Sequence, residues 1–285
     1  MQLMDYRRRI YGLFKSVVRI LITVYILLGL ILYFKQSSFL FQPTKDVLEN
    51  PADIGLKYES VELKTADGLK LSAWYVPAND SNLTLVFCHG NGGNISHRLA
   101  NLEILNNLGV NCIIFDCRGY GNSEGKPTEQ GVYLDTQTAY DWLINEKKAP
   151  AGNILIYGQS LGGSVATHLA SEVKARGLII ESTFTSFIDM AHHYYPYLPV
   201  KLFAKFRFNT FENLKKIKYP VLIIHSKKDD LIPYEFGQKL YEEAANEPKT
   251  FVEISGTHNE GFLTSGQVYI DGLSNWLKFI ENYQH

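Results

Sequence analysis

The hydrophobic positions along the chain follow three patterns, one after another. Residues 20–34 form an uninterrupted apolar run, ILITVYILLGLILYF, without a charged residue. Residues 58–63 and 69–76 then alternate apolar and polar positions around Asp67-Gly68, which predicts a β-hairpin. In the rest of the chain, short continuous apolar runs alternate with stretches of helical period. This last pattern is typical of buried parallel strands joined by helices.

The third pattern predicts a mostly parallel sheet. Its apolar runs, the predicted strands, are residues 83–88, 112–115, 154–157, 178–180, 221–224 and 251–254. The predicted helices between them are residues 96–108, 128–145, 161–174, 234–245 and 267–283. Strands that alternate with helices favour right-handed crossovers, with helices on both faces of the sheet. Residues 36–285 therefore predict one α/β domain of ordinary enzyme size.

The apolar run near the N-terminus has the length of a membrane-spanning helix. Extended to residues 16–34, it would be about 28 Å long as a helix, close to the hydrocarbon thickness of a bilayer. A cleaved signal peptide would need small residues at an A-x-A-like site, but the run is followed by KQSSFL at residues 35–40. A buried soluble helix would show a polar stripe, which the run lacks. We expect residues 1–35 to be a basic head and an uncleaved single-pass anchor, with the bilayer as its partner.

The distribution of charge predicts the orientation of this anchor. The whole chain has 28 Lys and Arg against 29 Asp and Glu, a net charge of −1 that does not point to nucleic acid as a partner. Residues 1–19 nevertheless hold five bases against one acid: Arg7, Arg8, Arg9, Lys15 and Arg19 against Asp5. Positive residues favour the cytoplasmic side, so we expect a cytoplasmic N-terminus and an extracytoplasmic domain.

One stretch interrupts the alternation of strands and helices. Residues 183–215 are too long for a plain crossover and are rich in aromatic residues: Phe184, Phe187, Tyr194, Tyr195, Tyr197, Phe203, Phe206, Phe208 and Phe211. These rings could be extra core, or they could form a cap with an apolar underside for substrate or an outer face against lipid. We interpret the stretch as a cap-like insertion. His192-His193 within it lack the spaced partners of a metal site.

The strongest chemical signal is the sequence GQSLGG around Ser160. It lies between a predicted strand and a predicted helix, and it matches the G-x-S-x-G nucleophile motif in the strand–turn–helix context that the motif requires. Glycines on both sides of the serine allow a tight turn. The start of the helix directs free N–H groups to the place where negative charge would develop. Ser160 is therefore the predicted nucleophile.

A serine nucleophile needs a base and a group that orients the base. On this type of sheet they follow the serine in the order acid, then histidine, at the ends of later strands. Residues 226–233, SKKDDLIP, follow one predicted strand, and both Asp229 and Asp230 are candidates for the acid. His258 follows the last predicted strand on a glycine-containing loop and is the predicted base.

The loop after the strand at residues 83–88 reads HGNGGN. Its glycines allow backbone N–H groups to approach a substrate, so the amides of Asn91 and Leu161 are the predicted donors of an oxyanion hole. The loop lacks the G-K-[ST] ending of a phosphate-binding loop. We interpret His89 as a structural residue that braces the loop.

Taken together, these motifs resemble the α/β-hydrolase superfamily. The order is HGNGGN, then FDCRGYGNSEG at residues 115–125, GQSLGG, HSKKDDLIP and GTHNE at residues 256–260. More narrowly, the chain is similar to small membrane-anchored serine hydrolases related to fungal bud-emergence proteins and their animal counterparts, over roughly residues 36–283. The family pattern H-[GS]-x-x-D-x-x-[VI]-P places the acid on Asp229. Two mild departures are Ser226, where glycine is common, and Cys117, where an aromatic residue often stands.

The resemblance implies an esterase, lipase or acyl-protein thioesterase that uses a Ser160–His258–Asp229 triad and needs no metal or organic cofactor. The anchor and the aromatic cap favour a lipid, an acylated protein or another apolar ester or thioester as substrate. A serine peptidase is an alternative, because fold does not fix function. So is acyl transfer to an acceptor other than water. A membrane-tethered interaction protein without activity should lack a triad residue, and none is missing. The oligomeric state is left open.

Overall fold

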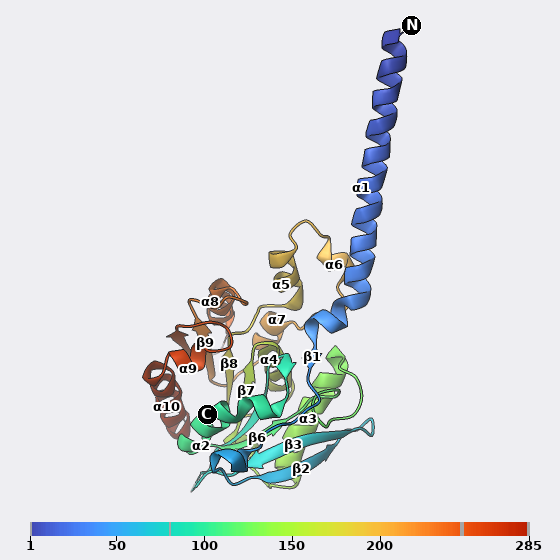
Figure 1. Ribbon diagram of the computed structural model, residues 1–285. Helices are drawn as coiled ribbons and strands as arrows, with labels where there is room; N and C mark the ends of the chain where they lie inside the picture. The colour runs from blue at the N-terminus through green and yellow to red at the C-terminus, as the bar shows by residue number, and fades with distance from the viewer. Residues whose placement is uncertain (1, 80, 246–247, 284–285) are drawn as a thin grey trace.

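Eight strands form the central sheet of the computed structural model, which describes residues 2–79, 81–245 and 248–283. Their order is β10-β9-β8-β7-β4-β6-β3-β2 (Figure 1). The strands from β10 to β6 are parallel, and β3 is antiparallel to both of its neighbours, β6 and β2. Their bounds are β2 Glu59–Lys64, β3 Lys70–Val76, β4 Thr84–Cys88, β6 Asn111–Phe115, β7 Ile154–Gln159, β8 Gly177–Glu181, β9 Val221–Ser226 and β10 Lys249–Ile254.

The burial of the strands explains why their sequences are continuously apolar. Every residue of β4, β6, β7, β8 and β9 is buried, because helices cover both faces of the sheet. The hairpin strand β2 alternates exposed and buried residues, as an edge strand with one solvated face does. The predicted hairpin and parallel strands are therefore confirmed. The ends of each predicted strand agree with those of an observed strand to within one or two residues.

The helices divide between the two faces. One core, on one face, contains apolar residues of α3, α4, α7 and α8, and the other contains those of α2 and α10. The bounds are α2 Leu99–Asn107, α3 Glu129–Asn145, α4 Leu161–Glu172, α7 Thr210–Leu214, α8 Tyr234–Glu243, α9 Gly261–Thr264 and α10 Gln267–Asn282. Short 3-10 turns lie at Pro51–Ile54, Ile95–Arg98 and Ala151–Asn153. The predicted α/β-hydrolase fold is confirmed.

Helix α1, Gln2–Leu40, projects from the domain as one long rod (Figure 1). Over Tyr6–Leu40 it is long and apolar enough to cross a membrane, and its apolar side chains are exposed. The helix continues past residue 35, where we predicted the anchor to end, and stops at Leu40, directly before the buried Phe41. Two residues later the chain forms β1, Gln42–Pro43, which pairs in parallel with β5, Gly92–Gly93.

The aromatic insertion at residues 183–215 consists of two parts. Phe184, Phe206 and Phe208 are buried in the core, and α7 packs on α4. The segment with α5, Phe187–Tyr194, and α6, Val200–Phe203, instead stands beside α1 and exposes its large apolar side chains (Figure 1). These exposed side chains are Tyr194, Tyr195, Tyr197, Leu202 and Phe203. The insertion thus contains extra core in one stretch and a protruding segment in another, residues 187–203, which we call the cap.

A buried ion pair fixes the loop after β6 to α3. Arg118 donates from Nη2 to Asp135 Oδ1 at 2.7 Å, and its backbone N–H donates to Asp135 Oδ2 at 2.8 Å. The Asp135 side chain is completely buried. Replacing Arg118 with methionine would leave this carboxylate without its cation, so we expect the free energy of unfolding to fall by about 3–5 kcal/mol.

Urea unfolding of the full-length chain in detergent micelles measures this loss. Lys70→Met is the matched control, because the Lys70–Glu62 pair is exposed on both sides and such pairs contribute about 0–1 kcal/mol. Equal losses in the two variants would contradict the assignment of Arg118–Asp135 as a structural pair.

Candidate active site

Ser160 occupies the sharp turn between β7 and α4. Its φ of +56° and ψ of −123° lie in a region that residues with a Cβ rarely adopt, a strained conformation that is common at functional sites. The turn is held by close packing as well as by hydrogen bonds. A Cβ added to Gly158 would collide with the carbonyl of Gly162, and one added to Gly162 would collide with the carbonyl of Cys88. The glycines of the motif are therefore required by the approach of α4 to the sheet.

The topology of the sheet brings the three predicted catalytic side chains together. β7, β8, β9 and β10 are consecutive parallel neighbours, so the loops after their carboxyl ends meet at one edge. Ser160 Oγ lies 2.9 Å from His258 Nε2, and His258 Nδ1 lies 2.8 Å from Asp229 Oδ2. All three side chains are largely buried.

The hydrogen bonds determine where the proton of His258 lies. An ionised carboxylate only accepts hydrogen bonds, so Nδ1 of His258 carries a proton and Nε2 accepts from the Ser160 hydroxyl. Burial alone would raise the pKa of Asp229. The hydrogen bond with His258 and those from the backbone amides of Ile232 and Leu231 outweigh burial and lower this pKa below its ordinary value. Asp229 is therefore ionised at neutral pH and orients the imidazole.

The two adjacent aspartates have different partners. Asp229 contacts the His258 imidazole through both carboxylate oxygens, at 2.8 and 3.0 Å. Asp230 instead accepts a hydrogen bond from the backbone N–H of His258 at 2.8 Å. Asp229 thus orients the ring and Asp230 holds the loop that carries the ring. The role of Asp230 was missed in the sequence, where the pair was treated as two alternatives for one position.

The glycine loop, residues 89–94, passes directly beside Ser160. A Cβ added to Gly90 would lie 3.4 Å from Ser160 Cβ. The Asn91 carbonyl accepts from Gln42 N at 3.1 Å and from Tyr120 Oη at 2.8 Å, which fixes this part of the loop. Leu161 begins α4, so its N–H is one of those without a carbonyl partner in the helix. A cavity of about 20 Å³ lies between the glycine loop and Leu161.

His89 braces the glycine loop through its ring. Its Nδ1 lies 2.7 Å from Gly90 O, and its Nε2 lies 3.5 Å from the buried Asp116 carboxylate. Asp116 also accepts from Ile95 N at 2.9 Å, at the end of the loop. Among the residues that the structure describes, no group of three His, Cys, Asp or Glu side chains could hold a metal ion.

A buried carboxylate under the site was missed in the sequence. Glu181 ends β8 and accepts hydrogen bonds from Tyr157 at 2.7 Å, Tyr269 at 2.8 Å and Gln159 at 3.0 Å. Burial raises the pKa of Glu181, and these three hydrogen bonds oppose the rise. Its backbone carbonyl accepts from Ser160 N at 2.9 Å. In the sequence, only its position directly after the apolar run at residues 178–180 could have indicated that Glu181 lies at the carboxyl end of a strand, near the site.

A family model described as the alpha/beta hydrolase fold matches residues 84–214. Protein bem46 of Schizosaccharomyces pombe is 33% identical over 245 residues, which cover 82% of this chain and 82% of the relative. The chain belongs to the α/β-hydrolase family. The resemblance to bud-emergence proteins that its motifs indicate is thereby confirmed.

Two further comparisons describe this α/β-hydrolase more closely. An uncharacterized membrane protein of Saccharomyces cerevisiae is 29% identical over 257 residues, covering 86% of this chain and 90% of the relative. The solved structure of the esterase Pf2001 of Pyrococcus furiosus is 26% identical with a TM-score of 0.70, covering 84% of this chain and 98% of that one. The fold and the esterase neighbour support a hydrolase, and α1 is the helix that could span a membrane.

Proposed function

We propose that this α/β-hydrolase is a serine hydrolase that cleaves carboxylic ester or thioester bonds of an apolar acyl substrate. The observation that carries the proposal is the hydrogen-bonded chain from Ser160 through His258 to Asp229, located at the strained turn between β7 and α4. A nucleophile, a base and a residue that orients the base, each within hydrogen-bond distance of the next, are the parts that acyl transfer through serine requires.

The mechanism follows from the protonation of these groups. His258 Nε2 takes the Ser160 proton as Oγ attacks the substrate carbonyl, and the backbone amides of Asn91 and Leu161 stabilise the resulting oxyanion. The imidazolium, paired with Asp229, then gives the proton to the leaving oxygen or sulfur and leaves an acyl-enzyme. Water repeats the sequence: His258 takes its proton, the hydroxide attacks the acyl carbonyl, and Ser160 recovers the proton.

We also propose that α1 anchors the enzyme in a membrane. In this arrangement residues 1–35 form the basic head and anchor, residues 36–285 form the hydrolase domain, and residues 16–34 contact lipid. The bases before the apolar run favour a cytoplasmic N-terminus and a domain on the opposite side. The exposed apolar surface of α1 and the membrane protein among the relatives support the anchor.

Hydrolysis of a series of nitrophenyl esters, from acetyl to palmitoyl, tests the proposed reaction. We expect the full-length chain in detergent micelles to hydrolyse them and to lose all activity after one equivalent of a fluorophosphonate. Mass spectrometry should find that label on the peptide that contains Ser160, since a serine beside an imidazole base is the activated nucleophile. A folded chain that neither hydrolyses an ester nor takes up the label would contradict the proposal.

The same series separates substrate classes. A maximum at long acyl chains would support lipids or acylated proteins, whereas a maximum at acetyl would indicate a small ester. Peptidase activity would be recognised by cleavage of acylated peptides at a higher kcat/KM than that for any ester.

A further inference from the structure

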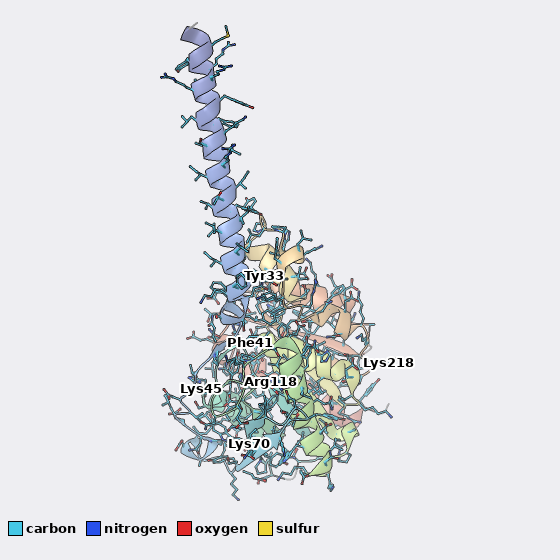
Figure 2. All side chains as sticks on the ribbon, turned by 90° about the vertical axis from the view of Figure 1, so that its right-hand side faces the viewer. Tyr33, Phe41, Lys45, Lys70, Arg118 and Lys218 are labelled. Carbon is cyan, nitrogen blue, oxygen red and sulfur yellow. The ribbon has the colours of Figure 1, made fainter. Side chains whose placement is uncertain are left out.

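An apolar groove of about 850 Å³ lies between the second half of α1 and the cap segment with α5 and α6. This volume is within the range of roughly 300–1,000 Å³ that ligand pockets occupy. Gly29 and Tyr33 contribute to the α1 wall, and Phe187 and Met190 to the cap wall. Among the described residues that line the groove, none is charged. Tyr33 lies where α1 meets the cap (Figure 2). The groove therefore offers an apolar ligand a site with almost no polar partners.

Contacts between α1 and the cap indicate how deep the groove would lie in a bilayer that α1 spans. Tyr25, near the middle of the uncharged run at residues 20–34, donates from Oη to the Tyr197 carbonyl at 2.9 Å. From Phe34 to Tyr25 the helix rises about 14 Å, which is close to half of a hydrocarbon core of roughly 30 Å. When residues 20–34 cross the bilayer, the tip of the cap is thus immersed in the leaflet on the side of the domain.

The tip of the cap is suited to an apolar surrounding. Backbone groups in lipid must find partners within the protein. Pro196 and Pro199 carry no N–H, and the carbonyls of Tyr197 and Phe203 accept from the α1 side chains Tyr25 and Gln36. Local turns use further groups, such as Leu198 N to Tyr195 O at 3.0 Å and Leu202 N to Pro199 O at 2.9 Å. Tyr197 is 91% exposed, so at this depth its ring would contact lipid.

Two series of contacts connect the groove to the proposed reaction centre. Tyr194, which lines the groove, donates from Oη to the Leu231 carbonyl at 2.6 Å, and Leu231 N donates to Asp229 Oδ1 at 2.9 Å. On another side, the ring of Phe187 contacts Phe206 with 5.9 Å between centroids, and Phe206 contacts Phe41 at 5.5 Å. Phe41 also lines the small cavity beside the glycine loop.

We propose that this groove binds a fatty acyl chain of a membrane lipid ester, which enters sideways from the leaflet between α1 and the cap. Helix α1 is then one wall of the acyl site as well as an anchor. The proposal rests on the proposed function for the reaction itself, because the acyl chain must lead to the Ser160 hydroxyl. It assigns the substrate to the bilayer rather than to the aqueous phase.

Gly29 allows a direct test. A Cβ added there meets nothing within 4 Å, and Gly29 lines the groove, so the indole of Gly29→Trp would occupy the space of the acyl chain. Gly12→Trp is the matched control on the same helix, away from the cap, where an added Cβ also meets nothing within 4 Å.

The first measurement uses the full-length chain in phosphatidylcholine nanodiscs with nitrophenyl palmitate and nitrophenyl acetate. In Gly29→Trp we expect the ratio of kcat/KM for palmitate to that for acetate to fall by about tenfold or more, the scale at which a blocked apolar pocket discriminates. Gly12→Trp should leave the ratio as in the wild type. A ratio unaffected by Gly29→Trp would overturn the groove as the acyl site.

The second measurement requires no turnover. The nanodiscs contain a phosphatidylcholine with a diazirine at the end of one acyl chain, and cross-links to the protein are mapped after irradiation. We expect label on Met190 in the wild type and its loss in Gly29→Trp, with label on the exposed Leu21 of α1 in both. An unlabelled Met190 beside a labelled Leu21 would overturn the inference even if esters are hydrolysed. A labelled Met190 without ester hydrolysis would instead support the groove and refute the proposed reaction.

Discussion

Replacing Ser160 with alanine is expected to lower kcat for ester hydrolysis by roughly 10⁶-fold, because it removes the attacking oxygen of a group of residues that act as a unit. His258→Ala should have an effect of similar size, since Nε2 at 2.9 Å is the acceptor for the Ser160 proton. The double variant should be no slower than either single one. Nitrophenyl ester turnover by the full-length chain in micelles measures all three.

Ser164 supplies the matched control. It lies one turn further along α4, is completely buried, and its hydroxyl finds no hydrogen-bond partner among the residues that the structure describes. Ser164→Ala should therefore keep wild-type turnover and unfolding. Ser160→Ala should also keep the wild-type unfolding transition and the association with membranes. Near wild-type turnover in Ser160→Ala would refute the proposed nucleophile.

Asp229→Asn is expected to lower kcat by about 10⁴-fold, the cost of an imidazole held in the wrong tautomer. The backbone N–H groups of Leu231 and Ile232 need an oxygen at the Oδ1 position. The amide NH2 therefore takes the Oδ2 position, where the His258 Nδ1–H needs an acceptor at 2.8 Å. The proton of His258 would then move to Nε2, the atom that must accept from Ser160. Turnover of the same esters, compared at several pH values, measures the loss.

The neighbouring Asp230→Asn separates the two aspartates. Asparagine retains an oxygen that accepts the backbone N–H of His258, so turnover should fall far less than in Asp229→Asn. The reverse order of effects would transfer the orienting role to Asp230. Since both substitutions remove one negative charge next to His258, a nonspecific electrostatic effect would lower the two rates equally.

The fold could be predicted because its strands are buried on both faces. Such strands must be apolar throughout, and this distinguishes the run at residues 154–157 from the alternating hairpin strand β2, Glu59–Lys64. The relative positions of Ser160, Asp229 and His258 followed from the same regularity, because parallel neighbours bring their carboxyl ends to one edge. The positions along the chain did not separate the two adjacent aspartates, and only the resemblance to the family pattern favoured Asp229. The role of Asp230 could not be predicted, since the two differ in which atom of His258 each one contacts.

The contacts between α1 and the domain could not be read from the sequence. The two-residue strand β1 is too short to show a periodic pattern. The hydrogen bonds of Tyr25 and Gln36 to the cap join residues that are 172 and 167 positions apart. The aromatic residues of the insertion have one composition but two environments: Phe208 is buried in the core and Tyr197 is exposed. Only the tertiary arrangement decides between these environments.

The short pairing of β1 with β5 connects α1, the proposed membrane anchor, to the glycine loop beside Ser160. Gln42 N donates to Asn91 O at 3.1 Å, Asn91 Nδ2 donates to Leu40 O at 3.0 Å, and Thr44 N donates to Gly93 O at 3.1 Å. Phe41 is buried at the junction of α1 and the domain (Figure 2). Membrane helices tilt to match the thickness of the bilayer. In a membrane-anchored enzyme, a change in the tilt of α1 would therefore shift the glycine loop through these three hydrogen bonds. The position of the loop relative to Ser160 would then depend on the thickness of the bilayer.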